Sequence, residues 1–312
     1  MLYRVFDGHC DTPVELWLQE KQLRSSDLAV SLDKAAGLGG YAQFFAFCTA
    51  WIETRMPHTE HFSRALDYFL AQLRKNEDRI TLCRTAPEAE AAMQAGKCAA
   101  FLAIEGAEAV REDEGLLELA YEAGVRMVSL VWNLPNSLSG SCQTGEGLTE
   151  KGKRFFRRAQ KLGMLVDVSH LSEKGFWDMA ELAEKPIVAS HSDSFAVCPH
   201  PRNLTDEQFM RISASGGIVG VPLVGPHLCD VSTRRATISD VINHIEYFLG
   251  LDGQHTVCLG CDFDGTDSLP VEIDSIATLY RLADAMSARN FSDELIGAIF
   301  YQNAYNFLKR MF

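Results

Sequence analysis

Short apolar runs, many of them rich in β-branched residues, recur along the chain and predict eight strands. They lie at residues 3–9, 41–48, 98–106, 125–133, 164–170, 186–192, 217–223 and 256–265. The runs are hydrophobic almost throughout, which is typical of parallel strands that are buried on both faces. An antiparallel sheet with one face in water would alternate apolar and polar residues more regularly. The pattern therefore favours a parallel sheet that helices cover.

Segments with helical periodicity lie between most of these runs. Residues 58–75 place their apolar side chains on one stripe, and the segment from Leu295 to Met311 does the same. Strand and helix alternating eight times predict an α/β protein of the (β/α)₈ TIM barrel type. No Pro-, Ser- or Gly-rich linker and no internal repeat divides the chain, so we expect one domain over residues 1–312.

Two connections between the predicted strands are unusually long. Residues 10–40 join the first two strands, and residues 134–149, which are rich in Gly, Ser and polar side chains, follow the fourth. Connections of this length in a compact domain tend to be functional or disordered. Both would lie at the mouth of the barrel.

Composition and charge narrow the class of protein. Hydrophobic residues make up 47% of the chain and charged residues 23%, which is typical of a globular protein. The net charge of −13 repels nucleic acid and anionic membrane surfaces, so we expect a small-molecule substrate. The N-terminal residues lack the pattern of a signal peptide, and no run reaches the roughly 18 apolar residues of a membrane span. We therefore expect a cytoplasmic protein.

The nine cysteines are scattered and odd in number, which suits buried thiols in a reducing compartment. Cys258 and Cys261 form a C-x-x-C motif inside a predicted strand. Residues three apart on a strand face opposite ways, so we interpret this pair as core cysteines rather than as ligands of one metal ion.

Polar residues end five of the predicted strands, at the edge where barrel enzymes carry their active sites. These residues are His9, Asp11, Glu105, His170, His191, Asp262 and Asp264. Imidazoles and carboxylates are ligands for Zn²⁺, and also for Mn²⁺, Fe²⁺ or Co²⁺. A carboxylate can bridge two ions about 3.5–4 Å apart, and Glu105 is the best candidate because its strand lies between the two groups of ligands. The strand ends together predict a metal site.

Each of these residues taken alone has a structural explanation. His170 and His191 could be core histidines that bond to backbone carbonyls. Asp262 and Asp264 could be turn or capping carboxylates, and for Asp264 this interpretation is favoured. His58 and His61 lie on the predicted helix of residues 58–75, where we expect a solvated face. The agreement of separate strand ends favours the metal site over these explanations.

Arg202 follows the sixth predicted strand in the segment "CPHPRNLTDEQ", residues 198–208. A guanidinium group matches the geometry of a carboxylate, so Arg202 could hold a substrate carboxylate with two hydrogen bonds. The alternative is a surface arginine in a Pro-rich turn, with residues 203–205 leading into the next helix.

The chain resembles the membrane (renal) dipeptidases, peptidase family M19, within the amidohydrolase superfamily. The resemblance rests on "DGHCDTP", "AIEG", "GLTEKGKRFFRRAQKLGMLVDVSHLS", "PIVASHS", "HPRNLTD" and "LGCDFDG", which follow in that order along nearly the whole chain. It implies a hydrolase of dipeptides, often tolerant of a D-residue at the C-terminal side, in which a hydroxide between two zinc ions attacks the peptide carbonyl.

The resemblance also implies roles for individual residues. By this analogy, His9 and Asp11 hold one Zn²⁺, His170 and His191 hold the other, and Glu105 bridges them. Asp262 would shuttle the proton. Arg202 would bind the free carboxylate of the substrate, with Asn203 as a further substrate contact.

One position departs from the family pattern. Where the family has a histidine in a "TLTH"-like motif that contacts the substrate, this sequence reads "SLVW" and places Trp132. Tryptophan donates one N–H but cannot act as an imidazolium, so we expect weaker stabilisation of an oxyanion. The fourth predicted strand also lacks a lysine, which favours the glutamate as bridge over the carboxylated lysine of other amidohydrolases.

Three functions stay open on these grounds. The first is a zinc dipeptidase. The second is an enzyme with the same metals that cleaves N-acyl amino acids or another small amide, with an apolar group against Trp132. The third is a catalytically silent barrel that binds a small acidic metabolite or a partner protein. Retention of Asp262 beside all five ligands argues against the third. A homodimer is compatible with each of them.

Overall fold

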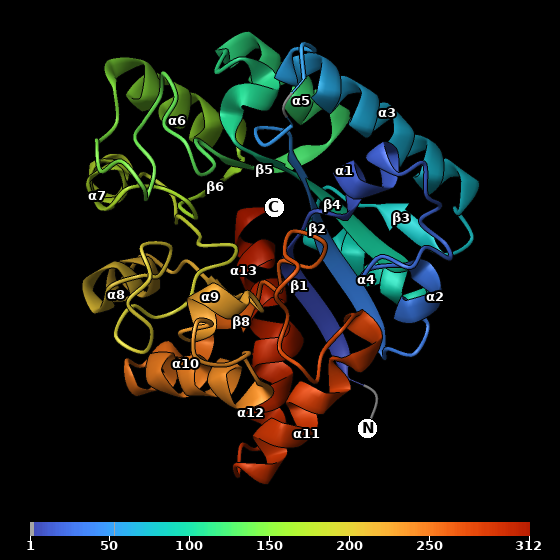
Figure 1. The fold of residues 1–312 in the computed structure, drawn as a ribbon. Coiled ribbons are helices and arrows are strands. Elements are labelled where there is room, and N and C mark those ends of the chain that lie inside the picture. The colour runs from blue at the N-terminus through green and yellow to red at the C-terminus, as the bar shows by residue number, and fades with distance from the viewer. Residues whose placement is uncertain (1–2, 53) are drawn as a thin grey trace.

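The computed structural model describes residues 3–52 and 54–312. Its centre is a curled parallel sheet surrounded by helices (Figure 1). The strands are β1 (Arg4–Cys10), β2 (Gly40–Cys48), β3 (Ile80–Leu82), β4 (Cys98–Glu105), β5 (Val125–Ser129), β6 (Leu165–Asp167), β7 (Val219–Val221) and β8 (Val257–Leu259). Neighbouring strands pair in the order β6-β5-β4-β2-β1-β8-β7. The predicted (β/α)₈ fold class is confirmed.

Residues 186–192, the sixth predicted strand, lie between β6 and β7. Single parallel bridges join Asp167 to Val188 and Ala189 to Val219. The amide N–H of Val188 donates to the Val166 carbonyl at 3.1 Å, and that of Ala189 donates to the Ile218 carbonyl at 3.0 Å. This segment therefore has the position of a barrel strand but not the continuous ladder that we expected.

The sequence pattern missed β3. This strand has three residues, which pair with Cys98, Ala99 and Ala100 at the start of β4, while β5 pairs further along β4. A strand this short carries no periodicity that distinguishes it from a loop. It pairs only with the start of β4 and does not reach the end of β4 that carries Glu105.

Helices cover the sheet, and several begin with the side-chain caps that stabilise a first turn. They are α1 (Thr12–Leu18), α2 (Leu32–Ala35), α3 (His58–Lys75), α4 (Ala86–Gln94), α5 (Glu114–Ala123), α6 (Glu150–Leu162), α7 (Glu173–Leu182), α8 (Asp206–Ala214), α9 (Gly225–Leu228), α10 (Ile238–Gly250), α11 (Tyr280–Ala288), α12 (Asp293–Gly297) and α13 (Asn303–Met311). The predicted C-terminal helix is thus α12 and α13, joined by a π-helical turn over Ala298–Gln302. No helix among the described residues is both long and apolar enough to cross a membrane.

The two faces of the sheet bury different clusters of side chains. Phe6, Phe44 and Phe101 stack on the inner face of the curl, where residues of α4 and α13 join them. The alternate residues of the same strands, such as Phe45 and Leu102, belong to the layer between the sheet and the outer helices. This alternation follows from the two-residue period of a strand. Both clusters are apolar, and buried polar residues lie at the carboxyl ends of the strands.

The long connection over residues 10–40 contains α1 and α2, so it is less irregular than its sequence suggests. Residues 134–149 contain neither a helix nor a strand. Isolated bridges pair Ser139 with Leu148 and Ser141 with Leu171.

Candidate metal centre and active site

The candidate ligands come from the carboxyl ends of separate strands. His9 lies near the end of β1, Glu105 is the last residue of β4, His170 follows β6, and His191 follows the bridge residues of segment 186–192. Asp11 is the residue before α1. All five are buried, and the exposed fraction is 1% for both His9 and His191 and 3% for Glu105.

Glu105 lies at the centre of this group. Its Oε1 is 2.8 Å from the Nε2 of His170 and 3.3 Å from the Nε2 of His191. Its Oε2 is 3.5 Å from the Nε2 of His9. The His9 Nε2 is in turn 3.8 Å from the Asp11 Oδ2. The two oxygens of Glu105 therefore face different groups of side chains. Oε1 faces His170 and His191, and Oε2 faces His9.

The arrangement fits a pair of metal ions. Ligand atoms of His9, Asp11 and Glu105 lie within 4.8 Å of one another, and so do those of Glu105, His170 and His191. Two ligands at the usual zinc distances in a tetrahedral site are about 3.3 Å apart. The second group comes close to this, because the Nε2 atoms of His170 and His191 are 3.0 Å apart. The His9 Nε2 and the Asp11 Oδ1 are buried without a hydrogen-bond partner among the described residues.

Burial and neighbouring charges both shift the pKa values of the candidate ligands. Burial opposes ionisation of Glu105, but the His9 and His170 rings hold its pKa well below the usual value. Burial also works against protonation of His9, and the Glu105 and Asp11 carboxylates outweigh it and raise the pKa of that ring. Burial and the Arg202 charge lower the pKa of His170 to about 4, so its ring is neutral at pH 7 and offers a lone pair.

The outer nitrogens of the three imidazoles bond to residues that we did not predict. The Nδ1 of His170 is 2.8 Å from the Oδ1 of Asn133. The Oγ of Ser190 is 3.3 Å from the Nδ1 of His9 and 2.7 Å from the Nδ1 of His191. Such partners orient metal-binding histidines in many proteins. The signal in the sequence is weak, because a serine or asparagine beside a strand end is common.

Asp167 is a further residue that the sequence analysis missed. A carboxylate oxygen of Asp167 lies within 4.8 Å of ligand atoms of His9 and His191. Its Oδ1 accepts the backbone N–H groups of Ser169 at 3.0 Å and Ser190 at 2.9 Å, and its Oδ2 accepts the Ser190 hydroxyl. These bonds assign Asp167 to the support of the histidines. The aspartate inside the apolar run "MLVDVSH" was the available signal.

Asp262 and Asp264 follow β8 and have different surroundings. The Oδ1 of Asp262 is 3.9 Å from the Nε2 of His9, and burial raises the pKa of this carboxyl. Asp264 instead accepts bonds from the Thr12 hydroxyl at 2.6 Å and from the Ala29 amide at 2.6 Å. These contacts give Asp264 a structural role, as expected, but its backbone partners are the distant residues 29–30 rather than a turn or a helix start.

The backbone at the site is held in uncommon conformations. His170, Asp262 and Asp264 have φ angles of 69°, 60° and 66°. Positive φ is rare for residues with a side chain and concentrates at functional sites. A Cβ on Gly265 would come within 2.2 Å of the Asp11 Oδ2 and 2.4 Å of the Asp262 Oδ1, so only glycine lets the chain pass these two carboxylates.

Arg202 is buried rather than at the surface. Its Nη2 donates to the His191 carbonyl at 3.2 Å, and its Nε has no partner among the described residues. Arg202 and His170 line one cavity of about 390 Å³. Asn203 also lines this cavity, but its Nδ2 donates to the carbonyls of Cys198 at 2.9 Å and His227 at 2.8 Å. These bonds hold the segment that carries Arg202.

Trp132 lies near the candidate ligands and lines a different cavity from Arg202. It is half-buried, and its ring centroid is 6.2 Å from that of His170. Together with Asp11, Trp51 and Leu28 it lines a second cavity of about 610 Å³. The two cavities therefore flank the candidate metal centre.

The predictions for His61 and for the C-x-x-C motif have different outcomes. His61 is buried, and its Nε2 is 2.9 Å from the Thr54 Oγ1. The expected solvated face is therefore wrong for this residue, because α3 turns it inward. Cys258 and Cys261 are buried free thiols in different clusters, on the inner face and in the outer layer.

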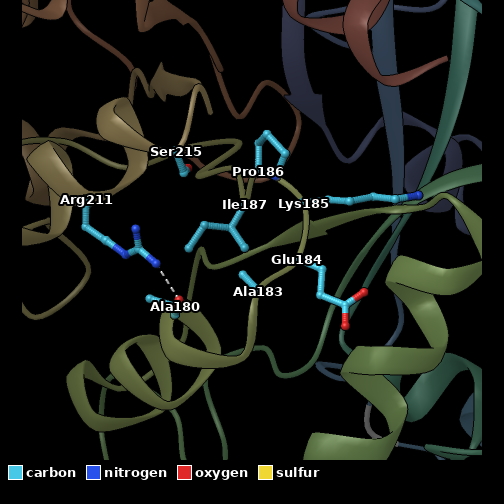
Figure 2. Close-up of a pocket in the computed structure, with 8 residues that line it drawn as sticks. All are labelled: Ala180, Ala183, Glu184, Lys185, Pro186, Ile187, Arg211 and Ser215. Atoms are coloured by element: carbon cyan, nitrogen blue, oxygen red, sulfur yellow. Dashed lines mark hydrogen bonds between the residues drawn. The ribbon is translucent and has the colours of Figure 1, made fainter.

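A further pocket lies apart from the candidate residues, near the start of segment 186–192 (Figure 2). Pro186 and Ile187 line it, together with Arg211, whose guanidinium donates to the Ala180 carbonyl at 2.6 Å. It contains none of the predicted site residues. His191 lies at the other end of the same segment, so this pocket is not part of the centre.

Comparison with known proteins identifies the family. The model of the membrane dipeptidase family, peptidase family M19, matches residues 2–311. A protein of Klebsiella pneumoniae described as an uncharacterized protein in the pqqA 5′ region is 36% identical over 243 residues, which cover 75% of this chain and 89% of that protein.

Two solved structures match over the full length of the chain. A metallo peptidase from Rhodobacter sphaeroides, liganded with a phosphinate mimic of the dipeptide L-Ala-D-Ala, is 29% identical, with a TM-score of 0.89 and 100% of both chains covered. A metallo peptidase described as the dipeptidase AC is 31% identical, with a TM-score of 0.90 and coverage of 100% of this chain and 99% of that chain. The chain therefore belongs to the membrane dipeptidase family, peptidase family M19, and is a peptidase of the metallo-dipeptidase type.

Proposed function

We propose that this protein hydrolyses the peptide bond of dipeptides with two zinc ions. His9 and Asp11 would hold one ion, His170 and His191 the other, and Glu105 would bridge them. When bound, the ions supply polarisation of the scissile carbonyl and a lowered pKa of the attacking water. The convergence of both ligand groups on the two oxygens of Glu105 supports this proposal.

The buried guanidinium of Arg202 is the observation that indicates the class of substrate. It forms no ion pair within 4.0 Å with the part of the chain that the structure describes. A buried charge without a partner is costly, whereas a bound carboxylate gives it two charge-assisted hydrogen bonds. The cavity beside His170 therefore suits the free α-carboxylate of a substrate. In a dipeptide, the scissile bond is one residue away from that carboxylate. This short separation favours dipeptides over longer peptides. L,D-dipeptides belong to the same class.

Asp262 would move the proton. Its carboxyl faces the ligand group and is held out of water, which raises its pKa. Asp262 accepts a proton from the attacking water and donates it to the amine as the peptide bond breaks. The bond to the carbonyl carbon forms at the water oxygen, and the leaving group departs as a neutral amine.

A second candidate function is hydrolysis of N-acyl amino acids. The cavity on the Trp132 side has apolar walls at Val14, Trp51 and Leu269. Such walls suit an acyl chain as well as the side chain of an amino-terminal residue. Trp132 offers one N–H donor to the substrate in either case.

A substrate panel tests these functions. We expect the purified enzyme to bind two equivalents of zinc, to cleave L,L- or L,D-dipeptides, and to lose turnover on chelation. Turnover of N-acyl amino acids alone would favour the second function. An enzyme that binds metal without turning over either class would be the silent barrel.

Variants of two arginines test the carboxylate site. We expect Arg202→Ala to raise KM for dipeptides by about 100-fold, because a charge-assisted pair is worth about 3 kcal/mol. Arg211→Ala is the matched control, since Arg211 lies at the pocket of Figure 2 and should leave KM unchanged. Equal KM values in the two variants would contradict the assignment.

A further inference from the structure

We propose that Ser190 is a positioning residue whose single hydroxyl sets the tautomer of one imidazole in each ligand group, so that affinity for both metal ions depends on it. This inference rests on the proposed metal centre. It concerns a residue that neither touches the substrate nor binds a metal ion.

The Ser190 Oγ has three polar neighbours. It lies 2.5 Å from the Asp167 Oδ2, 2.7 Å from the His191 Nδ1 and 3.3 Å from the His9 Nδ1. A hydroxyl has one proton to donate and two lone pairs that accept. The three contacts can therefore all be hydrogen bonds only if one neighbour accepts and the other two donate.

Asp167 is the neighbour that accepts. Its Oδ1 receives the N–H groups of Ser169 and Ser190, so the other oxygen is the acceptor left for the Ser190 hydroxyl. The Ser190 proton goes to its Oδ2. The two lone pairs of Ser190 then receive the Nδ1–H groups of His9 and His191. In the neutral state that binds a metal ion, both rings are consequently the tautomer with a bare Nε2.

These bare nitrogens face Glu105. The Nε2 of His9 is 3.5 Å from its Oε2, and the Nε2 of His191 is 3.3 Å from its Oε1. The ring centroids of the two histidines are 3.9 Å apart, which is why one hydroxyl reaches both. His170 belongs to the second ligand group but has its own acceptor, the Oδ1 of Asn133 at 2.8 Å. Ser190 therefore acts on both groups, and Asn133 acts on one.

Three glycines fix the backbone of Ser190. A Cβ on Gly220 would lie 2.0 Å from the Ser190 carbonyl oxygen, one on Gly260 would lie 1.9 Å away, and one on Gly8 would lie 3.1 Å away. The strands can approach Ser190 this closely because these positions carry no side chain. The hydroxyl consequently has a defined place between the two rings.

Zinc titrations of three variants test the proposal. Removing a partner of a ligating histidine typically lowers metal affinity by about 10–100-fold. We expect Ser190→Ala to lose about this factor at both zinc sites and Asn133→Ala to lose it at one. Ser194→Ala is the control, because the Ser194 hydroxyl is also buried, follows the same segment and has no partner among the described residues. It should bind zinc like the unmodified enzyme, measured by competition with a chromophoric chelator.

Nitrogen-15 NMR of the metal-free protein provides a readout that needs no metal. We expect His191 to carry its proton on Nδ1 in the unmodified protein and in Ser194→Ala, and to become a tautomer mixture in Ser190→Ala, because this ring lies 2.7 Å from the Ser190 Oγ. Loss of affinity at one site only, or unchanged tautomers in Ser190→Ala, would overturn the role of Ser190. Failure of the unmodified protein to bind zinc would instead overturn the proposed function, while the NMR result still decides the tautomers.

Discussion

Asp262 and Asp264 are two residues apart and share a positive φ, yet their carboxyl groups have different partners. Asp262 faces His9 in the ligand group, whereas Asp264 bonds to Thr12 and to the backbone near Ala29. Residue type and the sign of φ are the same at both positions. The difference in role comes from what the fold brings against each side chain.

This contrast gives a prediction for single substitutions. We expect Asp262→Asn to keep both zinc ions and to lower kcat by about 10²–10⁴-fold, because the amide cannot carry a proton between water and amine. Metal content by mass spectrometry and steady-state kinetics measure this. Asp264→Asn is the matched control, and it should keep kcat but lower the melting temperature through its lost hydrogen bonds. Loss of zinc from Asp262→Asn would mean that Asp262 is a ligand.

At the scale of elements, the ends of β1, β7 and β8 meet the backbone of segment 186–192. This segment has few ladder bonds of its own, so its position depends on close approach to its neighbours. A side chain at Gly260 would displace it, and with it His191 and Ser190.

We expect Gly260→Ala to destabilise the fold by about 1–3 kcal/mol or more, the usual cost of overpacking a core. Gly250→Ala at the end of α10 is the control, because a Cβ there meets no atom within 4 Å and should leave stability unchanged or raise it slightly. Urea unfolding followed by circular dichroism compares the two. Equal stabilities would show that the segment has room to move.

Helix α10 also connects to this region through His244, which is fully buried. Its Nδ1 accepts the Ser194 N–H at 3.0 Å, and its Nε2 lies 3.1 Å from the Leu228 carbonyl. Burial lowers the pKa of this ring to about 4. The unfolded chain binds a proton here near pH 6.5, so between these two values it holds more protons than the folded protein.

Stability of the metal-free protein should therefore fall as pH decreases from about 6.5 towards 4, by up to about 3 kcal/mol from this residue. We expect His244→Asn to be less stable at pH 7 and to show a weaker dependence on pH over this range. Urea titrations at pH 7, 6 and 5 provide the free energies of unfolding. Parallel pH profiles of the variant and the unmodified protein would exclude His244 as a source of the dependence.

At the scale of the whole molecule, the candidate metal centre joins parts of the chain that are far apart in sequence. Its ligands come from β1, β4, the residues after β6 and segment 186–192. A ligand that binds only the folded state stabilises it by about 2.7 kcal/mol at 100 times its Kd. We expect chelation to lower the melting temperature and added zinc to restore it. An unchanged melting temperature would mean that the ions do not bind the folded protein.

The sequence predicted the barrel, and it predicted that the candidate ligands lie close together, for a physical reason. Parallel strands repeat a recognisable apolar pattern, and their carboxyl ends share one edge, so His9, Glu105 and His191 could be placed together without a structure. The partners of these residues could not be placed. Ser190, Asn133 and Asp167 are ordinary polar residues whose roles depend on contacts within a few ångströms. The burial of His61 likewise depends on such contacts, whereas β3 was missed because three residues carry no recognisable period.

Anomalous diffraction at the zinc edge, from crystals grown with zinc, tests the central claim most directly. We expect two peaks about 3.5–4 Å apart, one on each oxygen of Glu105, with His9 and Asp11 at one peak and His170 and His191 at the other. A single peak, or peaks away from Glu105, would contradict the two-metal centre and the hydrolysis proposed for it.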